Sequence, residues 1–185
     1  AELLANVADM EYYDYTAVPG VYYYYWIRTV GASGMSDFSR ADRGYAYLAP
    51  PASIAASAGT YSDRVQVTWS QVSGAAGYIL FRNQVANSNT SSELVRSSAL
   101  SYADTGASPG VEYYYWVKAY GAASTSTFSA GASGYRSLRT PSGVSASGGT
   151  YASGIQVLWS AVSGAVSYRV WRSATADAAS AAPVG

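Results

Sequence analysis

The sequence contains no cysteine and no histidine. Disulfide frameworks, thiolate zinc sites, cysteine nucleophiles and histidine-based acid–base catalysis are therefore excluded. Charge is also scarce, because only 12% of the residues are charged and eleven basic side chains balance eleven acidic ones. An average soluble domain carries about 25% charged residues. Without a basic field we expect no nucleic-acid partner, and without an apolar run of ~20 residues we expect no membrane insertion.

Tyrosine, by contrast, is abundant, with nineteen Tyr and five Trp in 185 residues. A shift of the chain by 90 positions aligns residues 23–26 with residues 113–116, both Tyr-Tyr-Tyr-Trp. From Tyr12 to Arg82, 34 of 71 positions carry the same residue as the position ninety later, without a gap. Compositional chance does not explain this match. The chain is built from a repeated unit of about 90 residues.

Within the unit, apolar residues recur with a period of two. Val65, Val67 and Trp69 alternate with Gln66 and Thr68. This period is typical of strands rather than helices. Short aromatic or β-branched runs are separated by turns rich in Gly, Ser, Pro and Asn every 8–12 residues or so, a spacing typical of a sandwich. We predict an all-β, Greek-key β-sandwich.

The unit resembles the fibronectin type III domain in a series of short motifs. They are an opening proline (Pro51, Pro141), Val/Ile-x-Val-x-Trp (65–69, 155–159), Gly-Ala-x-x-Tyr (74–78, 164–168), Tyr-x-Asp (12–14, 102–104), Pro-Gly-x-x-Tyr-x-Tyr (109–115) and Phe-Ser (38–39, 128–129). The resemblance covers nearly the whole chain, and bacterial extracellular tandem repeats of the type are the most similar. It implies that Tyr23 and Tyr113 are tyrosine-corner residues, whose hydroxyls bond back to the backbone.

The phase of the repeat divides the chain into three segments. Residues 51–140, the central segment, comprise one complete seven-strand unit. Residues 1–50, the N-terminal segment, correspond to the C-terminal half of a unit, strands E to G. Residues 141–185, the C-terminal segment, correspond to the N-terminal half, strands A to C. Neither half can close a sandwich, because three strands leave one apolar face and an open edge.

The two halves are complementary. Joined, they make one unit with a loop five residues longer than that of the central segment. The resemblance places the termini of a unit at opposite poles, so the complement of each half comes from another copy or from an adjacent repeat of a longer chain. A piece cut arbitrarily from a longer tandem array remains the alternative interpretation.

We predict that the C-terminal segment of one copy packs against the N-terminal segment of the next. Residues 181–185 would form a loop leading into an apolar strand at residues 2–7. The composite core would draw on Ile155, Val157, Trp159, Tyr168 and Val170 from one copy and on Tyr23, Tyr25, Ile27 and Phe38 from the other.

The same alternation places a stripe of aromatic side chains on the outer face of the sheet. Its members are Tyr24, Trp26, Tyr114, Trp116 and Trp171. We predict that Trp26, Trp116 and Trp171 are more exposed than Trp69 and Trp159. Three uses remain open: stacking within the sheet, contact with a neighbouring subunit, and a platform on which polysaccharide stacks.

Residues able to carry chemistry are few. Asp9, Glu11 and Asp14 are close in sequence and could bind Ca²⁺, but no Asp-x-Asp-x-Asp-Gly loop is present. Asp14 recurs as Asp104 without acidic neighbours, which favours a turn residue that accepts hydrogen bonds from nearby backbone. The serines have no His or Lys base beside them. We expect no catalytic residue, no metal site, no cofactor and no enzymatic activity.

Two functions fit this sequence. The first is a structural extracellular repeat protein, secreted or at the cell surface, which forms a filament or stalk by head-to-tail completion of a β-sandwich, since heterologous contacts propagate. Its partners would be other copies or adjacent repeats. The second is a non-catalytic spacer, or a carbohydrate- or adhesion-binding module, of a larger secreted bacterial protein.

Overall fold

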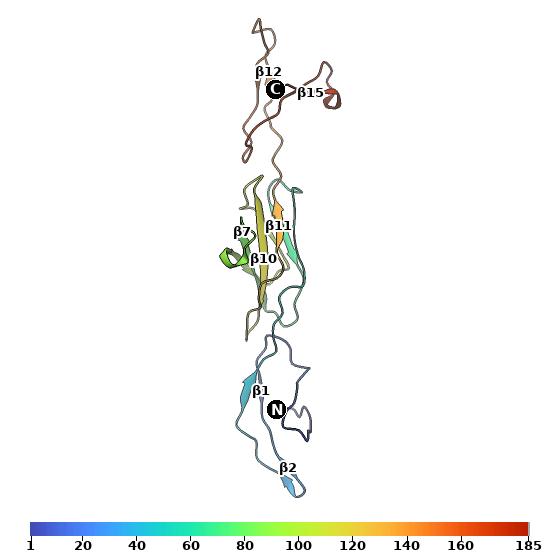
Figure 1. The fold of residues 1–185 in the computed structure, drawn as a ribbon, viewed down its shortest axis with the longest axis vertical. Coiled ribbons are helices and arrows are strands. Elements are labelled where there is room, and N and C mark those ends of the chain that lie inside the picture. The colour runs from blue at the N-terminus through green and yellow to red at the C-terminus, as the bar shows by residue number, and fades with distance from the viewer. Residues whose placement is uncertain (185) are drawn as a thin grey trace.

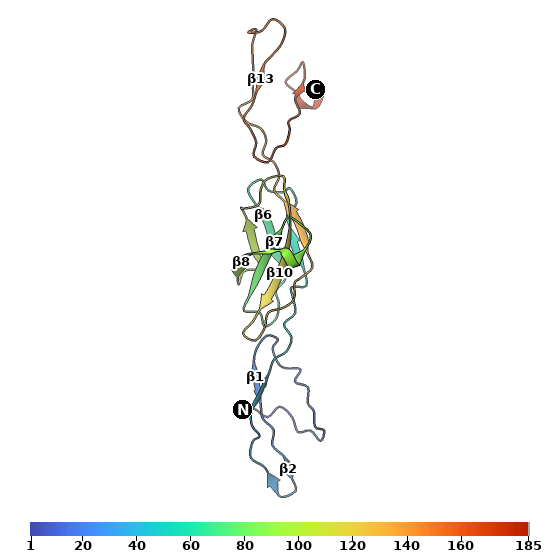
Figure 2. The same cartoon turned by 60° about the vertical axis from the view of Figure 1, so that its left-hand side comes forward.

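The computed structural model describes residues 1–184 of the chain. The three segments lie end to end along one axis, and the two termini lie in opposite outer segments (Figure 1). A view turned by 60° shows the same arrangement (Figure 2). The chain is therefore an extended rod with the central segment in its middle.

The central segment is a sandwich of two antiparallel sheets. The three-stranded sheet has the order β5-β6-β9 and the four-stranded sheet the order β11-β10-β7-β8. The bounds are β5 Ile54–Ala56, β6 Val65–Trp69, β7 Gly77–Asn83, η1 Ser88–Thr90, β8 Ser92–Ser97, β9 Ser101–Asp104, β10 Glu112–Tyr120 and β11 Ala132–Tyr135. The Tyr135 backbone also bonds to Ser57 and Gly59, which links β11 to the chain after β5. The predicted all-β sandwich is confirmed.

The core lies between these two sheets. Val65, Val67 and Trp69 of β6 are buried, whereas the intervening Gln66 and Thr68 are not. From β10, Tyr115 and Val117 are completely buried. A two-residue period thus fills the core from both sheets, as strand geometry requires.

The outer segments contain only short strand pairs. In the N-terminal segment, β1 (Tyr23–Tyr25) pairs with β4 (Asp42–Gly44), and β2 (Val30–Gly31) pairs with β3 (Gly34–Met35). In the C-terminal segment, β12 (Ser145–Ala146) pairs with β13 (Val157–Leu158), and β14 (Trp171–Arg172) pairs with β15 (Ala182–Pro183) after the short helix η2 (Ala178–Ser180).

Most of these pairings repeat, ninety residues away, a pairing of the central segment. Tyr24 lies opposite Arg43 as Tyr114 lies opposite Ser133. Likewise, β12 and β13 pair in the register of β5 and β6, and β14 and β15 pair in the register of β7 and β8. Local sequence therefore suffices for the strand pairs, although each outer segment lacks the strands that would cover it.

One expectation about the ends of the chain is wrong, and another stays a prediction. Residues 2–7, predicted as a strand of the docked pair, form no strand in the single chain, and Leu3 and Val7 are exposed. Ala182 and Pro183, predicted as loop, pair with Arg172 and Trp171 as residues 92 and 93 pair with β7. A strand needs an edge to pair with: β14 provides one, and the N-terminal segment has no counterpart of β7. Gly185, the last residue of the predicted loop, lies outside the described residues.

Candidate assembly surfaces

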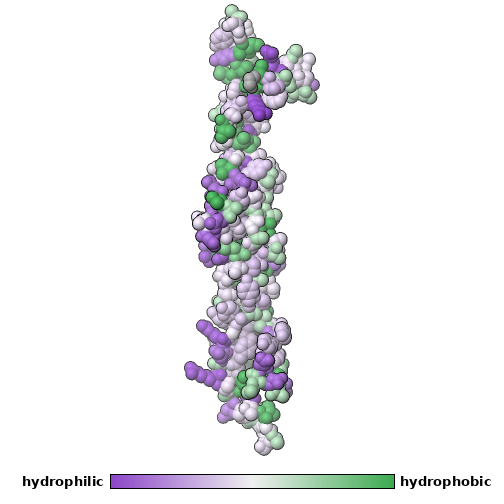
Figure 3. Space-filling model, in the orientation of Figure 1, coloured by the Kyte–Doolittle hydropathy of each residue, from purple (hydrophilic) through white to green (hydrophobic). Residues whose placement is uncertain are grey.

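The outer segments expose residues whose equivalents form the central core. Ile27 is 75% exposed and Ile155 is 68% exposed, whereas their equivalents Val117 and Val65 are completely buried. Tyr168 is 37% exposed against 4% for Tyr78. Hydrophobic residues accordingly appear on the surface of both outer segments (Figure 3).

The remaining predicted core residues are partly buried. Tyr23, Tyr25, Val157, Trp159 and Val170 are intermediate in exposure, while their equivalents Tyr113, Tyr115, Val67, Trp69 and Leu80 are buried. Trp159 already packs on Tyr168, with ring centroids 5.4 Å apart, as Trp69 packs on Tyr78 at 5.9 Å. The C-terminal segment therefore already has the Trp–Tyr contact of the central core in place.

Strand edges are open at matching places. Among residues 1–184, β1, β13 and β14 each have one neighbouring strand, whereas their equivalents β10, β6 and β7 each have two. The pairings that the outer segments lack are those of β10 with β7 and of β6 with β9. The first would join β1 to β14, and the second would join β13 to residues 11–14, the counterpart of β9, which form no strand in the single chain.

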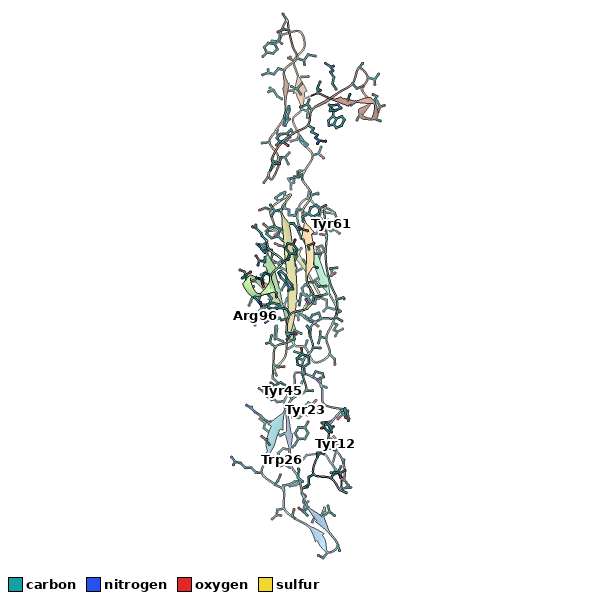
Figure 4. The ribbon with its side chains drawn as sticks, in the orientation of Figure 1. Tyr12, Tyr23, Trp26, Tyr45, Tyr61 and Arg96 are labelled. Carbon is teal, nitrogen blue, oxygen red and sulfur yellow. The ribbon has the colours of Figure 1, made fainter. Side chains whose placement is uncertain are left out.

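The tyrosine corner is present twice. The Tyr113 hydroxyl accepts a hydrogen bond from the Ser108 amide at 3.3 Å, and the Tyr23 hydroxyl accepts one from the Val18 amide at 3.2 Å. Hydrogen bonds to the Tyr113 hydroxyl lower the pKa of this residue, against the opposing effect of burial. Figure 4 labels Tyr23 and Tyr45 at the end of the N-terminal segment near the central segment, and Trp26 further along it.

Phe38 does not belong to the predicted composite core. Its equivalent Phe128 contacts Phe81 edge-on, with centroids 5.0 Å apart, and Lys118 Nζ lies 4.1 Å from the Phe128 ring centre. Phe38 similarly contacts the Arg28 guanidinium at 5.0 Å. Because Lys118 and Arg28 alternate with the core positions Val117 and Ile27, both phenylalanines lie on the outer face of the sheet.

The aromatic stripe is exposed only in the outer segments. Tyr24, Trp26 and Trp171 are exposed, but Trp116 is only 7% exposed, so its predicted exposure is wrong. The chain before β11 passes over the Trp116 indole, since a Cβ at Gly131 would lie 2.8 Å from Trp116 Nε1. Tyr114 stacks on Trp116 at 6.4 Å and is partly buried. In the central segment the stripe is thus packed into the sheet and covered by its own loop.

Sequence reasoning missed a buried ion pair. Arg82 Nη1 lies 2.8 Å from Asp104 Oδ2, and the Tyr115 hydroxyl donates to the same oxygen at 2.9 Å. The Gly106 amide donates to Asp104 Oδ1 at 3.0 Å, which is the expected turn contact. The pKa of Tyr115 is raised above its ordinary value, mainly because the side chain is buried. A signal existed, because Asp14/Asp104 and Arg82/Arg172 are the only charged positions that repeat unchanged.

The junctions between segments also repeat. Gly74 lies against the Pro19 carbonyl, and its equivalent Gly164 lies against that of Pro109, so close that a Cβ at either glycine would clash. Leu48 is fully buried at the first junction, where the Ala123 amide also donates to the Gly20 carbonyl at 2.9 Å. The second junction lacks that bond, because the C-terminal segment has no counterpart of residues 121–123. The repeated contact sets the axis of the rod.

Other site types find little support. Residues 1–184 contain no cluster of three or more acidic side chains placed to hold a metal ion. In the same range, no helix is both long and apolar enough to cross a membrane. A cavity of about 320 Å³ is lined by Arg82, Asn83, Gln84, Ser92, Glu93, Leu94 and Tyr113. Arg82 covers the Tyr113 ring there at 4.7 Å, which leaves that face unavailable for a ligand.

Comparisons with known proteins point to several solved structures. An Fn3-like protein from Clostridium thermocellum is 25% identical over 50% of this chain and 98% of that chain, with a TM-score of 0.45. A beta-1,2-glucanase from Parabacteroides distasonis is 22% identical over 50% of this chain and 13% of that chain, at 0.44. The FN1–FN3 domains of chicken CNTN1 are 21% identical over 90% of this chain and 62% of that chain, at 0.39. No family model and no curated protein matches the sequence.

Proposed function

We propose that this chain is a structural, extracellular repeat protein that forms a filament or stalk. The C-terminal segment of one copy packs on the N-terminal segment of a second copy, and together they complete a sandwich like the central one. The observation that carries the proposal is the match of open edges, because the two strand pairings missing from the outer segments are the ones that docking would create.

Burial favours this occupant over an unrelated partner. About eight side chains, namely Ile155, Val157, Trp159, Tyr168, Val170, Tyr23, Tyr25 and Ile27, would take the places of core residues. Fully burying such a side chain is worth roughly 1.5–3 kcal/mol. Five of the eight are already partly buried and gain only part of that amount, and the entropy lost on association and ordering offsets much of the rest.

Charge is complementary as well. Residues 1–50 contain six acidic and three basic side chains, whereas residues 141–185 contain one acidic and two basic ones. The N-terminal and C-terminal segments therefore attract each other, whereas two segments of the same kind gain less electrostatic attraction. The contact joins different surfaces at opposite ends of a rod, so it does not close on itself and propagates into a linear polymer.

Electron microscopy and sedimentation of the 185-residue chain test the proposal. We expect rods that lengthen with protein concentration. Trp159→Asp, which places a charge in the composite core, should abolish them, while Thr68→Asp on the solvent side of the central sheet should not. Compact monomers of the wild-type chain at all concentrations would refute the proposal.

Cross-linking tests the predicted register, because the natural sequence has no cysteine. By equivalence with Tyr114 and Asn83, Tyr24 of one copy lies opposite Ser173 of the next. Facing Cα atoms in such a pair are about 4.5–5.5 Å apart, within reach of a disulfide. A mixture of Tyr24→Cys and Ser173→Cys chains should form a covalent dimer under mild oxidation, and a mixture of Tyr24→Cys and Thr175→Cys chains should not.

A binding module of a larger secreted protein is the second candidate. It is favoured only by the exposed aromatics of the outer segments, with Tyr24 and Trp26 ring centroids 6.5 Å apart. A change of tryptophan fluorescence on titration with soluble polysaccharide, in a chain that stays monomeric, would favour this candidate over the first.

A further inference from the structure

The buried ion pair of the central segment joins both sheets. Asp104 ends β9 of the three-stranded sheet and is 1% exposed. Its partners Arg82 and Tyr115 stand opposite each other on β7 and β10 of the four-stranded sheet. Arg82 Nη1 contacts both carboxylate oxygens, at 3.0 Å and 2.8 Å. Removal of Arg82 would leave the Asp104 carboxylate buried without its cation, which is strongly destabilising.

The outer segments divide the same group between the two ends of the rod. Asp14 accepts hydrogen bonds from the Tyr25 hydroxyl at 3.0 Å and from the Thr16 amide at 2.8 Å. These residues correspond to Asp104, Tyr115 and Gly106. The N-terminal segment has no arginine at this site. The equivalent of Arg82 is Arg172, which is exposed on β14 of the C-terminal segment. Among the described residues, neither Asp14 nor Arg172 takes part in an ion pair.

We propose that Arg172 of one copy pairs with Asp14 of the next and so selects the partner and the register of docking. This inference rests on the proposed head-to-tail assembly. In the register of β7 and β10, Arg172 stands opposite Tyr25, whose hydroxyl already contacts Asp14. The guanidinium then completes the site around a carboxylate that is already held in place.

The pair disfavours wrong arrangements of the two copies, because each such arrangement leaves a charge of the pair without its partner. A shift of one residue turns every side chain of β14 to the other face of the sheet, which removes Arg172 from the composite core and leaves Asp14 without its cation. Docking of two C-terminal segments offers Arg172 no equivalent acid, because the only acidic residue there, Asp177, caps η2 through the Ala179 amide. Such penalties provide specificity in addition to affinity.

A double-mutant cycle on the full 185-residue chain tests the pair, with the concentration of half-maximal assembly as the measured quantity. We expect Arg172→Met and Asp14→Asn each to raise this concentration at least thirtyfold or so, since truncating one partner of a buried charge pair weakens binding strongly. In the double variant, the concentration of half-maximal assembly should exceed that of either single variant by no more than about threefold. The matched control, Arg169→Met two residues before β14, should not weaken assembly.

The outcomes separate this inference from the proposed function. If the wild-type chain assembles and the two single effects multiply in the double variant, the pair is absent and the inference is wrong, while assembly stands. If the wild-type chain never assembles, both are wrong. Hydrogen exchange of the central segment, which keeps its own Arg82–Asp104 pair, verifies that the central sandwich remains folded in every variant.

Discussion

The central and outer segments are built from one repeated sequence and differ in what covers them. Val67 and Val157 are the same residue, in the same strand register opposite Ala56 and Ala146. Yet Val67 is completely buried and Val157 is not. The comparison separates two levels of structure, because each strand pair of the outer segments forms within one segment, while burial needs strands that are distant in the sequence.

The largest difference should appear in hydrogen exchange of the dilute chain. The β7, β10 and β6 amides open only by unfolding of the sandwich, which for a domain of this size costs about 5 kcal/mol or more. We expect their exchange to be slowed a thousandfold or more, and amides of β1, β13 and β14 to exchange close to the rate of loops. Residues 51–140 expressed alone should keep the same protected set. Comparable protection of β13 and β6 in a monomer would contradict the comparison.

Equivalent valines give the next largest effect. Val67→Ala removes two buried methyl groups and should lower the free energy of unfolding by roughly 2–3 kcal/mol. Val157→Ala should change it by less than about 0.5 kcal/mol in the dilute chain, and should weaken assembly instead. Urea unfolding at low and high protein concentration measures both. Equal costs at the two positions in the monomer would show that the C-terminal segment has a closed core of its own.

Iodide quenching of single-tryptophan variants sharpens the comparison at the outer face. Trp26 and Trp171 should be quenched several times more strongly than Trp69 and Trp116, because only the first two are exposed. Assembly should protect Trp26 and Trp171 together, since the register of β7 and β10 places them opposite each other. Strong quenching of Trp116 would mean that the chain around Gly131 does not cover it in solution.

The smallest effect concerns one charge. In the assembled register Arg169 lies opposite Arg28, as Ile79 lies opposite Lys118. Like charges facing each other across strands are destabilising by roughly 0.2–1 kcal/mol. Arg169→Ile should therefore tighten assembly by up to about fivefold, whereas Arg40→Ile, outside the paired strands, should leave it unchanged. Weaker assembly of Arg169→Ile would exclude this register.

Several features were predictable because they depend on local pattern. The two-residue period identified the inward positions of β6, and the resemblance to the fibronectin type III domain implied both tyrosine corners. Trp116 was misassigned because alternation assigns a residue to a face but does not say what crosses that face. Phe38 was misassigned because the chain before β4 has no alternation that would fix its side.

The sequence by itself determined the 90-residue repeat, which is read from identical residues, and most of the strands, which follow from the local alternation of apolar residues. Only the tertiary structure decided three other features: the Arg82–Asp104–Tyr115 contact, the glycine junctions that align the segments, and the exposure of Ile27 and Ile155. All three join residues from separate strands or segments. A one-dimensional pattern records which positions are apolar or charged, and contact across space requires that the intervening chain be folded.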